Sequence, residues 1–231
     1  MKSNKSVNFI FGTIILAVIF TLAWGSGTAL AKDKEDAQGL VDKANVTLKG
    51  FLKDKNYSWI RENLGKAKGV LIYPQVLKAG FILGGSGGTG VLIAKDANGE
   101  WSQPAFYTLG SVSFGLQIGG EAAEVIVMCM TQKAVDALMT TKAKLGGDTS
   151  IALGPVGGGA KSNLMADFIS FTKSKGLYAG LNLDGSVVDV RESLNKAYYG
   201  AALTPIQIIV EKKAKNKGSS ALRDSLQKAT K

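Results

Sequence analysis

The chain has 231 residues and a formal net charge of +10, from 28 lysines and arginines against 18 aspartates and glutamates. It has no histidine and one cysteine, Cys129. These counts exclude Ser-His-Asp and Cys-His nucleophile systems and leave no ligand set for a zinc site. We therefore expect no catalytic residues, no metal and no cofactor. Cys129 lies in a wholly apolar run, which is typical of a buried, inert thiol.

Residues 1–31 have the three parts of a secretory signal peptide. Lys2 and Lys5 precede an uncharged apolar run over 7–24, and Ala29 and Ala31 form an Ala-x-Ala cleavage site. The alternative is an uncleaved anchor, since roughly 20 apolar residues span a bilayer. The cleavage site favours export to the periplasm or the cell exterior. The mature chain then divides into a domain over 32–210 and a basic tail over 211–231.

Residues 33–62 are predicted to form an amphipathic helix. Leu40, Ala44, Leu48 and Phe51 recur at steps of three and four, with charged residues between them. Such a helix either covers one face of a core or lies on a membrane, and the first is commoner in globular proteins.

From residue 69 onward, short apolar segments alternate with turn signals, which predicts strands. The expected strands are 70–73, 91–94, 101–109, 111–119, 123–130, 150–156, 168–173, 177–183 and 186–190. Helices are expected over 133–144, 192–199 and 205–213. The order predicts an α+β fold, with a curled, mostly antiparallel and barrel-like sheet flanked by N-terminal, middle and C-terminal helices.

The glycine-rich run over 84–90 invites comparison with a phosphate-binding loop. Such loops end in Gly-Lys-Ser/Thr at the start of a helix, and neither feature follows here. The run is predicted to be a bend between two strands.

Most of the positive charge lies near the C-terminus. Residues 211–231 hold seven basic and two acidic side chains, which is +5 of the total +10. A basic tail indicates a polyanionic partner, such as a lipid surface, an anionic glycan or nucleic acid, or it serves only solubility. Export makes nucleic acid the weakest of these partners.

Ordered segments along the chain resemble the SYLF domain family, also described as the Las17-binding or actin-regulator domain. They are KAKGVLIYP (66–74), KAGFILGG (78–85), GTGVL (88–92), GEWSQPAF (99–106), SFGLQIG (113–119), ALGP (152–155), SKGLYAG (174–180) and NKAYYG (195–200). The resemblance implies lipid binding. Eukaryotic relatives bind phosphoinositide membranes and some bundle actin filaments, whereas exported bacterial relatives look like single-domain lipid-binding proteins.

For this chain the resemblance implies a non-enzymatic protein that associates with an anionic phospholipid membrane surface through lysines and an amphipathic helix. The candidate lipid-binding residues are Lys66, Lys68, Lys78, Lys212, Lys213, Lys215 and Lys217. Each lysine can instead be an ordinary solvated charge. Two alternatives are a carrier of a hydrophobic ligand within the curved sheet and a protein-interaction module of the actin-regulator type. Neither nucleic acid nor metal is expected as a partner, and the sequence names no protein partner.

Overall fold

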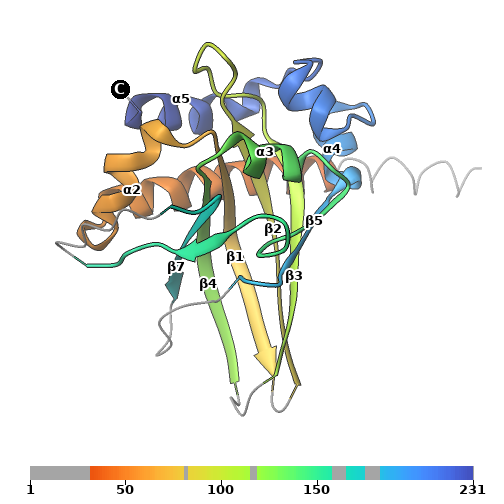
Figure 1. The fold of residues 1–231 in the computed structure, drawn as a ribbon. Helices are drawn as coiled ribbons and strands as arrows, with labels where there is room; N and C mark the ends of the chain where they lie inside the picture. The colour runs from red at the N-terminus through yellow and green to blue at the C-terminus, as the bar shows by residue number, and fades with distance from the viewer. Residues whose placement is uncertain (1–31, 81–82, 115–118, 158–164, 175–182, 231) are drawn as a thin grey trace, which may run out of the picture.

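A computed structural model of the chain describes residues 32–80, 83–114, 119–157, 165–174 and 183–230. Within these ranges, eight strands form one sheet in the order β5-β8-β3-β2-β1-β4-β7-β6. Neighbouring strands are antiparallel except β6 and β7, which are parallel. The sheet is curled and helices pack against it (Figure 1), so the predicted α+β class with a mostly antiparallel sheet is confirmed.

The strands are β1 Gly69–Gly80, β2 Leu83–Ala94, β3 Ala105–Phe114, β4 Gly119–Cys129, β5 Lys142–Lys144, β6 Ile151–Leu153, β7 Phe168–Ser174 and β8 Val187–Val190. An N-terminal helix covers residues 32–53 of the described chain. The later α-helices are α2 Ser58–Asn63, α3 Gln132–Leu138, α4 Glu192–Tyr199 and α5 Ser220–Ala229. Short 3-10 turns are η1 Lys55–Tyr57, η2 Leu64–Lys66 and η4 Lys217–Ser219, and η3 Ile206–Val210 is π-helical.

The N-terminal helix lies across one face of the sheet and buries its apolar side there (Figure 1). Val41, Ala44, Leu48 and Phe51 are each at most 1% exposed. The predicted single helix is interrupted at Asp54, whose carboxylate accepts a hydrogen bond from the Asn56 backbone (3.0 Å) and starts η1. Because the fold already occupies the apolar side, this helix does not offer the membrane-binding face that we expected of it.

Each face of the sheet carries its own apolar core, because successive side chains of a strand point to opposite faces. Val70 and Ile72 of β1 pack toward the N-terminal helix, α2 and α5. Leu71 and Tyr73 pack toward α3 and η3. Burial on both faces fixes the register, since a shift by one residue would exchange the two sets.

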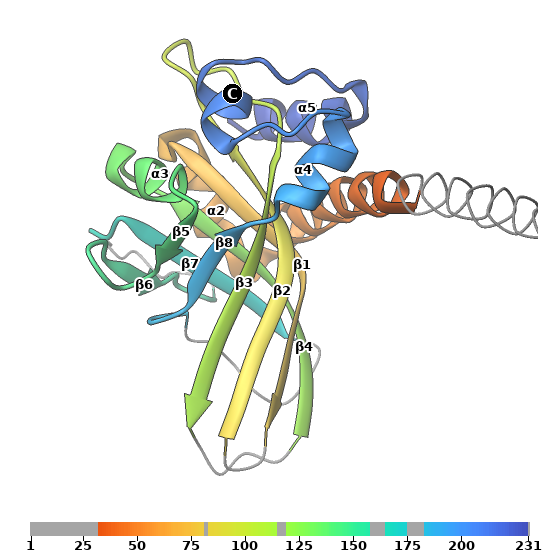
Figure 2. The ribbon, with the colours of Figure 1, turned by 90° about the vertical axis from the view of Figure 1, so that its right-hand side faces the viewer.

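The glycine run is not a bend, and the prediction there is wrong. Residues 84–90 belong to β2 and pair with β1 on one side and β3 on the other. β1 continues through Pro74 with a bulge between Ile72 and Gln75, opposite Gly90 and Thr89. Because β1 and β3 both provide hydrogen-bond partners to the backbone of β2, these residues form a strand despite the weak strand propensity of glycine. The far halves of β1 to β4 therefore extend well beyond the helices (Figure 2).

Three other predicted boundaries differ from the structure. One strand, β3, runs through Gly110 where two strands were expected. The helix expected over 133–144 ends at Leu138, and residues 142–144 form β5 because they pair with β8. Only the middle of the expected strand over 150–156 is strand. The strand expected over 177–183 falls almost wholly outside the described residues.

Candidate anion-binding pocket

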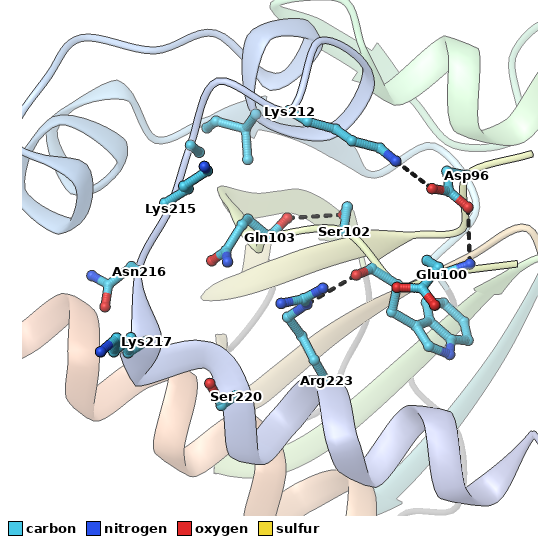
Figure 3. Close-up of a pocket in the computed structure, with 13 residues that line it drawn as sticks. Asp96, Glu100, Ser102, Gln103, Lys212, Lys215, Asn216, Lys217, Ser220 and Arg223 are labelled. Atoms are coloured by element: carbon cyan, nitrogen blue, oxygen red, sulfur yellow. Dashed lines mark hydrogen bonds and ion pairs between the residues drawn. The ribbon is translucent and has the colours of Figure 1, made fainter. Parts of the chain in front are cut away.

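A pocket of about 680 Å³ opens at the end of the molecule opposite the projecting strand ends. Three segments that are distant in sequence build it. The connection from β2 to β3 supplies Asp96 and residues 100–103, the segment after η3 supplies Lys212 and residues 214–217, and α5 supplies Ser220 and Arg223. Figure 3 shows these side chains facing one space.

Asp96 organises one wall of the pocket. Its carboxylate accepts hydrogen bonds from the backbone of Asn98 and Glu100, both at 2.9 Å, which closes the tight turn with Gly99 at φ 77°. The other carboxylate oxygen forms an ion pair with Lys212. The hydrogen bond from Lys212 is the main reason why the pKa of Asp96 lies below its ordinary value. This ion pair ties the 212–217 segment to the β2–β3 turn.

On the opposite side of the pocket, hydrogen bonds of the Asn216 and Ser219 side chains hold the segment that precedes α5. Asn216 accepts a hydrogen bond from the Gly218 backbone and donates to the Tyr198 carbonyl, both at 2.8 Å. Ser219 donates to the Gln103 side chain at 2.8 Å. These bonds position the start of α5, whose first backbone N–H groups carry the positive end of the helix dipole. The segment 212–220 is therefore fixed against the body of the domain.

Trp101 connects the pocket to a second group of cations. Arg223 donates through Nε to the Trp101 carbonyl at 2.9 Å. Lys95 lies 4.9 Å from the centre of the Trp101 ring and donates to the Gly65 carbonyl at 2.7 Å. Burial, and secondarily the nearby charge of Lys68, lowers the pKa of Lys95. The positive charge thus continues from the pocket across Trp101 to the start of β1.

The pocket has an excess of positive charge. Lys212, Lys215, Lys217 and Arg223 line it against Asp96 and Glu100. Among the residues that the structure describes, Lys215 and Lys217 form no ion pair, and both are exposed. Two unpaired ammonium groups beside a helix start are suited to a phosphate or another anion.

The structure separates the seven candidate lysines into groups. Lys212, Lys215 and Lys217 line the pocket, whereas Lys213 pairs with Glu211 at 2.6 Å and is not part of the lining. Lys66 and Lys68 lie at the start of β1, beside Lys95.

Lys78 lies near the other end of β1. Ten residue steps from Lys68 along an extended strand correspond to roughly 30 Å. It therefore belongs to the projecting strand ends and cannot act in the same site as the lysines of the pocket.

Sequence reasoning missed Arg223 and Lys95 as partners of this site. The charged segment 211–231 was expected to be a tail, but residues 217–229 form η4 and α5 and bury Leu222 and Leu226 in the core. A signal was present, because two leucines four residues apart indicate a helix that packs through one side. Nothing comparable marked Lys95, which tertiary structure alone brings to Trp101.

The single cysteine of the chain lies in the core, away from the pocket. Burial raises the pKa of the Cys129 thiol far above its ordinary value, so this group stays protonated and unreactive. Across the described ranges, no group of three or more metal-binding side chains is placed to hold an ion. Nor does any helix in those ranges combine the length and apolarity needed to cross a bilayer.

The family model described as "Ysc84: Las17-binding protein actin regulator" matches residues 110–229, which is just over half of the chain. The chain belongs to the Ysc84 (SYLF) family. The matched range includes the 212–217 segment and α5, so two of the three walls of the pocket lie within the Ysc84 domain. The resemblance read from the sequence is thereby confirmed.

Several curated relatives share this domain with the chain. It is 37% identical over 153 residues to the SH3 domain-containing protein PJ696.02 of Schizosaccharomyces pombe, covering 63% of this chain and 35% of the relative. It is 33% identical over 141 residues to the human SH3 domain-containing YSC84-like protein 1, covering 59% and 41%. LAS seventeen-binding protein 3 of Saccharomyces cerevisiae is 33% identical over 153 residues, covering 63% and 33%.

The Ysc84 chain described here thus matches only about a third to two fifths of the length of these relatives. No solved structure matches it.

Proposed function

We propose that this Ysc84-family protein is a non-enzymatic, peripheral lipid-binding protein whose pocket receives the phosphate of an anionic phospholipid headgroup. The observation that carries the proposal is the convergence of Lys212, Lys215, Lys217 and Arg223 around one open pocket at the start of α5. Each lysine near an anionic surface contributes about 1 kcal/mol to membrane binding. The apolar run and Ala-x-Ala site of residues 1–31 support action after export, at the cell envelope.

In this proposal the lysines contact the membrane, and the N-terminal amphipathic helix contributes no membrane-binding face. The apolar side of that helix is buried against the sheet, so the proposed contact surface is the anion-binding pocket, at the opposite end of β1 from Lys78. Ile206 and Val210, 44% and 62% exposed, stand beside the cationic segment and can enter the boundary between headgroups and acyl chains. Basic and apolar side chains adjoining one another are what a peripheral membrane surface requires.

Co-sedimentation of residues 32–231 with vesicles tests the proposal. Neutral phosphatidylcholine vesicles are compared with vesicles that contain phosphatidylglycerol, at low and high salt. We expect binding to the anionic vesicles only, decreasing with salt because exposed charges are screened. The double substitution Lys215→Gln and Lys217→Gln is expected to weaken binding about thirtyfold, from two lost contributions of about 1 kcal/mol each.

The matched control removes the same charge elsewhere. Lys53 and Lys55 are exposed and do not line the pocket, so Lys53→Gln with Lys55→Gln should leave most of the affinity. Lys78→Gln should also bind like the parent protein. If both double variants lose affinity equally, the pocket has no special role. If no vesicle is bound, the lipid proposal fails.

A protein partner is the second candidate function. The family description and the name of the Saccharomyces cerevisiae relative both refer to binding of Las17. In that case the same exposed cations would meet an acidic protein surface. Absence of vesicle binding would favour this candidate.

A further inference from the structure

A second pocket, of about 500 Å³, lies on the other side of η3 from the anion-binding pocket. Six of its ten lining residues are apolar, and the other four are three threonines and Glu192. Met139 follows α3, Val190 ends β8, and Leu203, Pro205 and Ile206 come from the segment that leads into η3. We call this pocket the apolar groove. Its size falls in the range of pockets that hold small organic ligands.

The walls of the apolar groove are anchored but not fully covered. Met139, Val190 and Leu203 are half-buried and pack with one side against the core of the α3 face. Ile206 remains 44% exposed at the edge. A ligand in the groove would therefore cover apolar surface on side chains that the core already holds in place, at little cost in side-chain entropy.

One continuous segment separates the two pockets. Residues 202–206 line the apolar groove, whereas Ile208, Lys212 and residues 214–217 line the anion-binding pocket. Ile206 and Ile208 are both in η3, two residues apart, so the two pockets lie on opposite sides of the same helical turn. An apolar groove and a cationic pocket in this arrangement match the two parts of an anionic amphiphile.

We propose that the apolar groove holds an alkyl chain of the same lipid whose phosphate lies in the anion-binding pocket. The inference rests on the proposed function and extends it: the protein binds single amphiphile molecules, with the chain withdrawn from the bilayer or from water. The ligand class is an alkyl or acyl phosphate, including phospholipids. The site lies outside the sheet, between α3, β8 and η3, and not within its curve.

Isothermal titration of the full chain with methyl, butyl and octyl phosphate tests the inference, because the three probes share a headgroup and remain monomeric. Each methylene that enters the groove should raise affinity by about fourfold. Ala202 is exposed and lines the groove, so Ala202→Trp should remove the gain with chain length while methyl phosphate binding stays unchanged. Ala201→Trp is the matched control, because Ala201 is exposed but does not line the groove.

The outcomes separate this inference from the proposed function. Equal affinity for the three phosphates would overturn the alkyl-chain site and leave the anion-binding pocket standing. A gain with chain length that survives Ala202→Trp, or that Ala201→Trp removes equally, would place the chain elsewhere and also overturn it. If methyl, butyl and octyl phosphate all fail to bind, both proposals fall together.

Discussion

At some glycine positions of β2 the fold has no space for a larger side chain. Gly90 of β2 lies opposite the bulge at Pro74, where β1 approaches most closely. A Cβ atom at Gly90 would lie 2.4 Å from the Ile72 carbonyl oxygen and 2.5 Å from the Tyr73 ring. At Gly87, three residues earlier, the nearest atom would be 3.6 Å away, an ordinary contact. The close approach of β1 therefore requires glycine at residue 90 but not at residue 87 of the same strand.

Gly90→Ala is expected to destabilise the protein by about 3 kcal/mol, since backbone and a buried ring must shift. Gly87→Ala should be neutral or stabilising by about 0.5 kcal/mol, because alanine loses less entropy in a strand. Urea unfolding followed by circular dichroism measures both. Equal effects of the two substitutions would contradict the close approach at the bulge.

Asp167 joins three elements through one carboxylate. It accepts hydrogen bonds from the Thr131 hydroxyl at 2.6 Å and from the Ser150 backbone at 2.9 Å, and Thr131 in turn caps α3. The bond from Thr131 is the main cause of its lowered pKa. A lowered native pKa means that these bonds stabilise the fold fully above the unfolded value of 3.8 and are lost as the pH falls through the native value.

Asp167→Asn should therefore cost about 1–2 kcal/mol at pH 7, where the charged acceptor is replaced by a neutral one. The difference from the parent protein should begin to shrink below the unfolded pKa of 3.8, where the unfolded carboxylate binds a proton first, and should be lost as the pH falls through the lower native pKa. Unfolding free energies between pH 7 and 3 test this, with Asp136→Asn as an exposed control. A difference that does not change with pH would refute the assignment.

The helix α5 lies in a segment that the sequence-based prediction assigned to a basic tail. Its charges alone favour a solvated tail, yet Leu222 and Leu226 are at most 1% exposed and belong to the core beneath the N-terminal helix. Removal of residues 211–231 would consequently disturb the fold as well as the charge. Substitution of single exposed lysines is the better probe of binding.

Leu226→Ala is expected to lower the free energy of unfolding by about 3 kcal/mol, from lost burial and the cavity that remains. Lys228→Ala, on the exposed side of the same helix, should change it by less than about 0.5 kcal/mol. Thermal and urea unfolding measure the pair. A negligible effect of Leu226→Ala would show that α5 does not form part of the core.

In the molecule as a whole, the two ends of the long strands have different chemistry. The helical end gathers the cations of the anion-binding pocket and, beside them, the apolar groove. The projecting end of β1, β2 and β3 carries Lys78, glycine and serine residues, and the exposed apolar side chains of Leu77 and Val112. A membrane approached by the helical end would meet the pocket first, which is why the vesicle experiment contrasts Lys215 and Lys217 with Lys78.

The sequence by itself determined the fold class, the core strands and the family. The continuous apolar runs over 70–73 and 125–130 identify strands, because strands that are buried on both faces of a sheet are apolar at every position. The helix predicted over 192–199 is α4, with the same bounds. The three pocket lysines of residues 212–217 were also named from their charge.

Only the tertiary structure decided where those lysines act. Glycines of β2 become strand because β1 and β3 bind both of their edges, which no local propensity reveals. Lys95 and Arg223 join the site through Trp101, and Lys78 is separated from it by the length of β1, because strand pairing and helix packing fix distances between residues far apart in sequence. The two pockets follow from that packing, and so do their positions on either side of η3.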